Sequence, residues 1–277
     1  MESAWFICPV CTAPLRPSAD RRQLVCARGH SFDIARQGYV SLVTGRTTAR
    51  GDTAAMVRAR RAFLAGGAYE PIAAGLSANL PDGLGAAGGR LADLGGGTGY
   101  YSAHLLREHP TWQGVLLDVS AAAARLAATA HPGLTVATAD LWASLPLVSH
   151  SLDAAIVVFA PRRPAEILRV LRPGGRCLVV TPGPRHLIEL RRTWPMVGLD
   201  PAKADRLADQ FAGFRRVGSY AIEYQRAFSR DDVANVIAMG PSAFHLTPAE
   251  LADIRTKSVQ TTVTVSVVLS VFCTPAA

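Results

Sequence analysis

Four residues near the amino terminus have the types and the spacing of a metal site. Cys8 and Cys11 are separated by two residues, and fourteen residues later Cys26 and His30 are separated by three. Each short gap lets two side chains reach one ion, and three thiolates with one imidazole complete a tetrahedral zinc shell. No coordination position stays open, so the pattern predicts a structural zinc site. The alternative is that Cys8, Cys11 and Cys26 are unrelated cysteines in a reducing compartment. We interpret the other two cysteines, Cys177 and Cys273, as ordinary buried thiols.

A second group of residues lies where three predicted strands end. The loop from Asp93 to Tyr100 has glycines at 95, 97 and 99, whereas a dinucleotide fingerprint requires glycine at 100. Asp118, which ends the next strand, can accept both hydroxyls of a ribose, and Asp140, which ends the third, can accept the amino group of adenine. These features describe an adenosine cofactor without pyrophosphate and favour S-adenosylmethionine. Each residue alone is also compatible with a helix cap or a strand-end turn.

Hydrophobic periodicity places these residues in an alternating pattern of strands and helices. Two helical stretches, 53–64 and 69–79, come first. The strands expected after them are Leu91–Leu94, Val115–Asp118, Leu134–Ala139, Ala154–Phe159, Arg176–Thr181 and Thr261–Phe272. The helices expected between and after them are Tyr100–Glu108, Ala121–Ala130, Pro164–Leu171, Asp231–Met239 and Pro248–Arg255. This alternation predicts an α/β protein with a doubly wound, mostly parallel sheet.

Three regions follow from these patterns. Residues 1–45 form the predicted zinc-binding domain, 46–80 a helical linker region, and 81–277 the cofactor-binding domain. A hydrophobic content of 49% excludes a mainly disordered chain, and the apolar stretches are too short to span a membrane. Five cysteines and no signal-peptide pattern lead us to expect a cytoplasmic protein.

The charge balance points to a nucleic-acid partner. The formal net charge is +8, and only two of the 29 basic residues are lysines. Arginine binds phosphate bidentately and stacks on bases, which suits RNA, although a GC-rich genome also favours arginine codons. The predicted RNA contacts lie in the first region and are Arg16, Arg21, Arg22, Arg28 and Arg36.

The chain resembles the zinc-containing 23S rRNA (guanine-N1) methyltransferases, which include members that confer resistance to the macrolides tylosin and mycinamicin. The resemblance rests on the zinc ligands and on several strings: Phe32–Val40, Gly51–Thr53, Ala59–Leu64, Gly99–Tyr101, Leu117–Ser120, Phe159–Pro161 and Thr181–Leu187. Two departures are Arg162, where the family often has cysteine, and Gly96-Gly97-Thr98, where it often has Cys-Gly-Glu.

The resemblance implies a class I, Rossmann-like methyltransferase fold with seven strands, the last antiparallel, and a homodimer whose cleft holds an rRNA hairpin. By matching position it also implies that Tyr69 and His186 touch the cofactor. The full predicted set is Tyr69, Asp93, Gly95, Gly97, Thr98, Gly99, Tyr100, Asp118, Asp140, Leu141 and His186.

The chemistry requires that guanine N1 lose its proton, either to a general base or with stabilisation of the resulting N1 and O6 charge. Asp52, Arg162 and His186 are the candidates for this role, and Asp52 is also a helix-cap candidate. Of the aromatic residues near the site, Tyr100 and Tyr101 suit either base stacking or the core, and we expect Phe159 in the core.

We therefore expect an S-adenosylmethionine-dependent 23S rRNA (guanine-N1)-methyltransferase that acts on a hairpin-loop guanine, of the 748 type rather than the 745 type. Macrolide resistance is the expected role. Two alternatives are a small-molecule methyltransferase of antibiotic biosynthesis and a non-catalytic RNA-binding protein.

Overall fold

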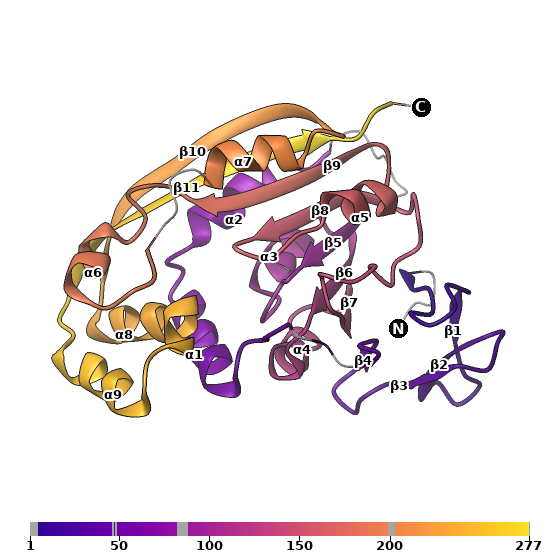
Figure 1. Cartoon of the computed structure of the whole chain (residues 1–277), viewed down its shortest axis with the longest axis horizontal. Helices are drawn as coiled ribbons and strands as arrows, with labels where there is room; N and C mark the ends of the chain where they lie inside the picture. Colours follow the sequence, from indigo (N-terminus) through magenta and orange to yellow (C-terminus); the bar gives the residue numbers. More distant parts are fainter. Residues whose placement is uncertain (1–4, 46, 48, 82–87, 199–202, 277) are drawn as a thin grey trace.

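The computed structural model describes residues 5–45, 47, 49–81, 88–198 and 203–276, and its centre is a large sheet (Figure 1). In spatial order its strands are β10 (Arg215–Phe228), β11 (Thr261–Cys273), β9 (Leu171–Pro182), β8 (Leu152–Val158), β5 (Arg90–Leu94), β6 (Gln113–Asp118), β7 (Leu134–Thr138) and β4 (Tyr39–Ser41). Strand β11 pairs antiparallel with both neighbours, and the other pairings are parallel. The expected α/β class and the antiparallel last strand are confirmed.

The described sheet has one strand beyond the seven expected, because β4 from the amino-terminal region pairs with β7 (Tyr39 opposite Val136). Three shorter strands, β1 (Leu15–Pro17), β2 (Gln23–Cys26) and β3 (Ser31–Asp33), form a separate antiparallel sheet.

Alternate residues of the central strands enter two different cores. Leu116 and Ile156 face the core that α2 (Glu70–Ser77), α3 (Tyr100–Glu108) and α4 (Ala121–Ala127) cover. Leu117 and Val157 face the second core, which α5 (Pro164–Val170) and α7 (Lys203–Gln210) cover in part. Because the central strands are parallel, their carboxyl ends, and the polar residues that follow them, lie at one edge of the sheet.

The amino-terminal segment covers the rest of the second face. Phe6 pairs with Leu147, and the Val148 amide donates to the Trp5 carbonyl over 3.0 Å. The connection from β7 to β8, described in full, contains no helix, so the crossover helix usual in such folds is absent there. Leu15 and Leu24 are buried in the same core as Leu117. The amino-terminal sheet therefore occupies the place of that helix.

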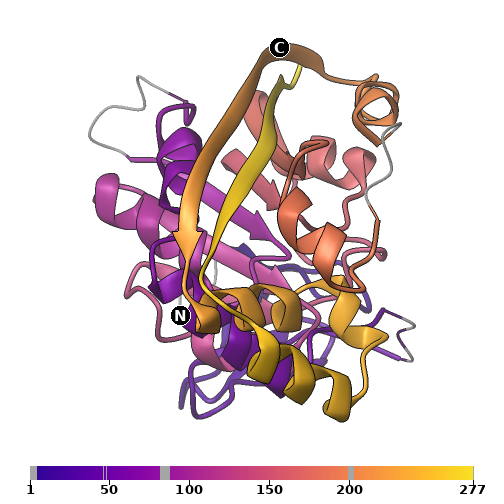
Figure 2. The same cartoon turned by 90° about the vertical axis from the view of Figure 1, so that its left-hand side faces the viewer.

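Three helices lie beyond the carboxyl ends of the parallel strands, on the side toward which the arrowheads of β8 and β9 point (Figure 1). They are α1 (Ala54–Ala65), α8 (Arg230–Met239) and α9 (Pro248–Lys257), with a 3₁₀ turn at Pro241–Phe244. The Thr53 hydroxyl caps α1 by accepting from the Met56 amide, and α1 buries Phe63 and Leu64. The long β10–β11 ribbon runs to α8 and α9 (Figure 2).

Element ends differ from expectation by a few residues. Helix α4 ends at Ala127 rather than 130, and β9 begins at Leu171, directly after α5. The short α6 (Ile188–Thr193) and α7 were not expected. No helix in the described ranges has the length and apolar character needed to cross a membrane.

Candidate functional site

The four predicted zinc ligands lie together in the amino-terminal sheet. Their ligand atoms all lie within 4.8 Å of one another. His30 Nδ1 is 3.6 Å from Cys8 Sγ and 3.4 Å from Cys26 Sγ, and Cys11 Sγ is 3.7 Å from Cys26 Sγ. Ligand atoms about 2.0–2.3 Å from one zinc ion lie roughly 3.3–3.8 Å apart at the corners of a tetrahedron. The donor set and its spacing therefore fit a structural zinc ion.

The glycine loop turns between β5 and α3 with three glycines in the left-handed region. Gly95, Gly97 and Gly99 have φ values of 77°, 56° and 78°. A Cβ atom at Gly95 would lie 2.5 Å from Cβ of Ala160, and that Cβ would fill the space next to the loop. Glycine is therefore required here by the left-handed backbone conformation and by the close approach of Ala160.

Asp93, which precedes this loop, has one carboxylate oxygen without a partner. Ser102 Oγ donates to Oδ2 over 2.6 Å, while the buried Oδ1 has no hydrogen bond. Burial raises the pKa of Asp93 to about 7. A buried acceptor without a donor is costly, so the geometry fits a donor supplied by a ligand.

Asp118 ends β6, and Asp140 follows the end of β7. Both line a pocket beside the glycine loop, which we call the first pocket. The Asp118 carboxylate accepts from the amides of Gly97 (2.9 Å) and Ser120 (2.8 Å), and burial raises its pKa. The Asp140 carboxylate accepts from the Trp142 amide (2.8 Å) and the Thr47 hydroxyl (2.7 Å). Leu141 lines the same pocket, as do Ala49 to Asp52 from the segment before α1.

Arg60 is a site residue that the sequence reasoning did not single out as functional. Its side chain joins the pocket of Asp118 and Asp140 to a second pocket, which contains Asp93, Tyr69, Thr98 and Tyr100. Its Nη2 lies 2.7 Å from Asp52 Oδ2 and donates to the Met239 carbonyl over 2.9 Å. Only the fold brings α1 and the end of α8 to this place, so no local motif could have identified the residue.

Tyr69 lines the second pocket and contacts His186, which is not one of the lining residues. The Tyr69 hydroxyl is 3.2 Å from Nε2 of His186, and both side chains are buried. Phe159 packs against both, with ring centroids 6.1 Å from Tyr69 and 5.6 Å from His186. The expectation that Phe159 belongs to the core is wrong. Its side chain is 39% exposed because φ is +54° at the end of β8, which turns the residue toward the pockets.

The remaining candidates are distributed as follows. Asp52 lines the first pocket and is paired with Arg60, whereas Thr53 takes the cap of α1. Arg162 lines neither pocket, and its buried Nε has no hydrogen-bond partner. The five predicted RNA-contact arginines are exposed in the amino-terminal region, away from both pockets: Arg16, Arg21, Arg22, Arg28 and Arg36.

Comparison with known proteins identifies the two parts of the chain separately. Residues 6–44 match a family described as "RlmA, N-terminal", a zinc ribbon, and residues 91–175 match a methyltransferase domain. A 23S rRNA (guanine(748)-N(1))-methyltransferase of Streptomyces fradiae is 45% identical over 88% of both chains. The chain belongs to the 23S rRNA (guanine-N1)-methyltransferase family. A relative from Micromonospora griseorubida, provisionally named for the same activity, is 43% identical over 95% of both chains.

Some more distant relatives match less than half of the chain. A malonyl-[acyl-carrier protein] O-methyltransferase of Methylococcus capsulatus is 36% identical over 41% of this chain and 45% of its own. Among solved structures, the phosphoethanolamine N-methyltransferase 2 of Haemonchus contortus has a TM-score of 0.50 at 15% identity, over 80% of this chain and 58% of its own. The latter likeness shows the class I methyltransferase fold.

Proposed function

We propose that this enzyme transfers the methyl group of S-adenosylmethionine to N1 of a hairpin-loop guanine in 23S rRNA. The 748-type guanine is the proposed target, and protection against macrolides the proposed role. The observation that carries the proposal is the identity of 45% to the Streptomyces fradiae enzyme across both the zinc ribbon and the methyltransferase domain. A small-molecule enzyme would share only the latter.

The residues of the two pockets fit S-adenosylmethionine. Asp118 has lone pairs left for the ribose hydroxyls, and Asp140 lies where the adenine amino group would bind. The unpartnered Oδ1 of Asp93 suits the ammonium group, and Arg60 suits the carboxylate. When bound, the cofactor supplies an electrophilic methyl group, so the chain's main task is to orient the donor and the nucleophile.

The proposed zinc ion has a structural role and is held by Cys8, Cys11, Cys26 and His30. The exposed arginines around it supply positive charge for phosphate contacts. A cytoplasmic homodimer that holds the hairpin completes the proposal.

The decisive experiment is site-resolved mass spectrometry of 23S rRNA after incubation with enzyme and S-adenosylmethionine. The substrate should come from a host that lacks the modification, with a guanine-to-adenine substitution at 748 as the matched control. We expect one N1-methylguanine in wild-type RNA at 748 and none in the control. Methylation at 745, or of a metabolite panel but not RNA, would contradict the proposal. No turnover despite RNA binding would indicate a non-catalytic RNA-binding protein.

A further inference from the structure

In the hydrogen bond between Tyr69 and His186, the donor and the acceptor can be assigned. His186 Nδ1 accepts a hydrogen bond from the backbone amide of Ser266 over 3.3 Å. Burial lowers the pKa of His186 to about 4, so its ring is neutral near pH 7. A neutral ring that accepts at Nδ1 carries its proton on Nε2. Nε2 therefore donates to the Tyr69 hydroxyl oxygen, 3.2 Å away.

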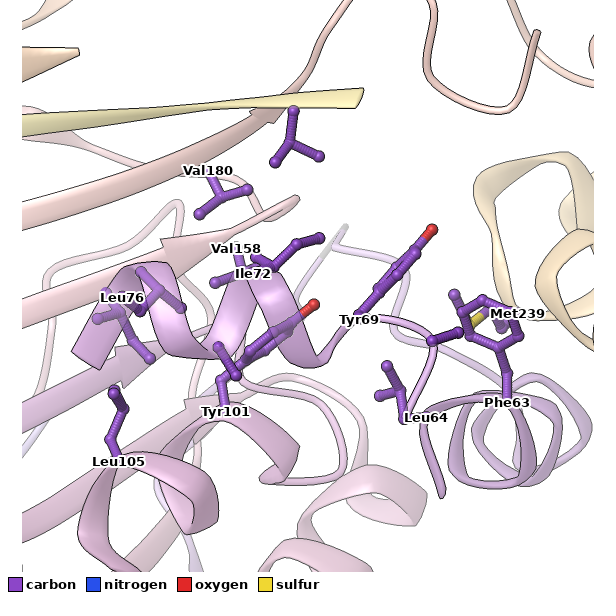
Figure 3. Close-up of a cluster of buried hydrophobic side chains, with 14 of the residues drawn as sticks. Phe63, Leu64, Tyr69, Ile72, Leu76, Tyr101, Leu105, Val158, Val180 and Met239 are labelled. Carbon is purple, nitrogen blue, oxygen red and sulfur yellow. The ribbon is translucent and has the colours of Figure 1, made fainter. Parts of the chain in front are cut away.

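This direction leaves the hydroxyl proton of Tyr69 available to a ligand. Burial also raises the pKa of Tyr69, so the hydroxyl stays protonated. Tyr69 lines the second pocket together with Val158 and Met239 and stands between them in Figure 3. It is thus a neutral hydrogen-bond donor in the pocket. His186, in contrast, has no nitrogen lone pair left to accept a proton from a substrate.

The backbone around this pair is held from several elements. Arg226 on β10 donates to the carbonyls of Gly67 (2.6 Å) and Gly66 (2.7 Å), in the turn before Tyr69. The Tyr224 hydroxyl donates to the Ala68 carbonyl over 2.8 Å. Arg191 Nε donates to the His186 carbonyl over 2.9 Å. The donor is therefore positioned before any ligand binds, as electrostatic stabilisation of a transition state requires.

Phe159 provides an aromatic face beside this donor. It lines both pockets, and its ring is inclined by 33° to that of His186. A bulky residue with φ of +54° is strained, and such strain persists only where the surroundings impose it. A partly exposed ring at the mouth of a cofactor pocket is suited to stack on an unpaired base.

We propose that Tyr69, oriented by His186, donates its hydroxyl proton in a hydrogen bond to O6 of the target guanine while the base stacks on Phe159. This inference rests on the proposed function. As N1 bonds to the methyl carbon, the carbon–sulfur bond breaks and sulfur keeps its electron pair. The N1 proton leaves to water, and the negative charge that this places on N1 and O6 is stabilised by the Tyr69 hydroxyl. Tyr69 is then a catalytic residue and His186 a positioning residue.

Other titratable and charged groups face the pair from the elements packed around it. They are Arg60 on α1, Asp93 on β5, Tyr100 and Tyr101 on α3, Arg191 on α6 and Tyr224 on β10. Substitutions at Tyr69 or His186 leave all of these groups in place, and Asp93→Asn is measured beside them to identify the part of the pH dependence that belongs to Asp93.

The test is the pH dependence of single-turnover methylation of the RNA hairpin by Tyr69→Phe. We expect a rate reduced by roughly 100-fold at neutral pH. Its rise with pH should shift to higher pH than in the wild type, because the N1 anion has lost its donor. The melting temperature should stay near wild type. Because Tyr69 also lines the pocket proposed for the cofactor, affinity for S-adenosylhomocysteine is measured separately and the rates are compared at saturating S-adenosylmethionine. Tyr220→Phe, at an exposed position of β10, is the matched control and should behave as wild type.

His186 separates positioning from a merely structural role. His186→Ala should shift the pH profile in the same direction as Tyr69→Phe, and the double variant should be no slower than Tyr69→Phe alone. His186→Gln keeps a donor and an acceptor and should recover part of the rate.

A binding probe without turnover is a hairpin that carries 2-aminopurine, which lacks O6, at the target position. Wild type should bind it about 10-fold more weakly than the guanine hairpin, and Tyr69→Phe should bind the two equally. Wild-type enzyme that forms no N1-methylguanine would refute the proposed function itself. An active wild type with an unshifted pH profile and unchanged discrimination in Tyr69→Phe would overturn this inference alone.

Discussion

Asp118 holds its carboxylate in place with two backbone amides, and each oxygen keeps a lone pair directed to the pocket. We expect Asp118→Ala to weaken S-adenosylmethionine binding by at least ~10-fold, because the variant cannot make two charge-assisted hydrogen bonds to the ribose. Titration calorimetry measures this. Asp209→Ala, an exposed acid on α7, is the control. Unchanged affinity of Asp118→Ala would remove the ribose assignment.

We expect Asp93 to make S-adenosylmethionine binding pH-dependent. Its pKa of about 7 means that the carboxyl group is mostly protonated at pH 5.5, and a protonated group does not pair with the cofactor's ammonium. Ligand binding therefore releases a proton, and affinity for S-adenosylhomocysteine should rise roughly 10-fold from pH 5.5 to 7, where the ligand's own ammonium stays charged. Calorimetry at the two pH values checks the rise. The slope should be much smaller in Asp93→Asn, and an equal slope there would assign the effect to another group.

Individual site residues can be predicted from the sequence where their role depends on neighbours in the chain. The zinc ligands are predicted from their spacing and the three acids from their places at the ends of predicted strands. The structure brings the four ligands together, and it places Asp118 and Asp140 in one pocket and Asp93 in the adjoining one. Arg60 is not predictable in this way because its partners, Asp52 and Met239, converge only in the fold. The prediction for Phe159 is wrong because an aromatic residue after an apolar strand usually continues into the core, and nothing local signals its positive φ.

The segment that enters α1 packs against the start of α4 at a glycine. A Cβ atom at Gly51 would lie 2.9 Å from the Ser120 amide nitrogen, and Ser120 Oγ donates to the Asp52 carbonyl over 2.7 Å. We expect Gly51→Ala to displace the segment from the pocket that it lines and to weaken S-adenosylmethionine binding several-fold. Gly198→Ala, where a Cβ meets nothing within 4 Å, is the matched control. Equal affinities of the two variants would show that the segment tolerates the displacement.

Elements with strong periodicity are predicted within a few residues, since buried parallel strands and amphipathic helices leave a clear pattern. Short elements are not. Strand β4 has three residues and joins the large sheet only through β7, far along the chain. Strands β1 to β3 form around the four clustered ligands, so no run of apolar residues marks them.

For the whole molecule, the boundary at residue 45 remains a prediction, but the segment before it shares a core with the sheet. Cys26→Ser should remove the bound zinc and, because structural zinc supplies folding free energy, loosen the amino-terminal sheet. Since Leu15 and Leu24 of that sheet are buried in one core with residues of β6 to β8, we expect the melting temperature of the entire chain to fall. Metal analysis and thermal circular dichroism measure both effects. Cys273→Ser is the control, and a wild-type melting curve for Cys26→Ser would show that the two parts are stable separately.

Because the exposed arginines of the amino-terminal region lie away from both pockets, we expect changes in them to affect RNA affinity but not cofactor affinity. If Arg22 and Arg28 contact phosphates, changing both to glutamine should lower the slope of log affinity against log salt by about 0.7–0.9 for each phosphate that is no longer neutralised. Cofactor affinity should not change, because neither residue lines a cofactor pocket. Filter binding across a salt series measures the slope. The control is the double variant Arg215→Gln with Arg216→Gln, which removes the same number of positive charges from β10, the strand at the opposite edge of the sheet. The same slope in both double variants would show that the amino-terminal arginines do not determine binding.

The pairing of the amino-terminal segment with the connection between β7 and β8 has a consequence for folding during synthesis on the ribosome. Residues 5–33 emerge first and can bind their metal through local contacts, yet their partners at 146–148 follow more than a hundred residues later. The amino-terminal sheet can therefore form first, but it can pack against the large sheet only after residues 146–148 have been synthesised. A chain translated without zinc reaches that stage with part of one face of its large sheet uncovered, and exposed apolar surface of that kind promotes aggregation.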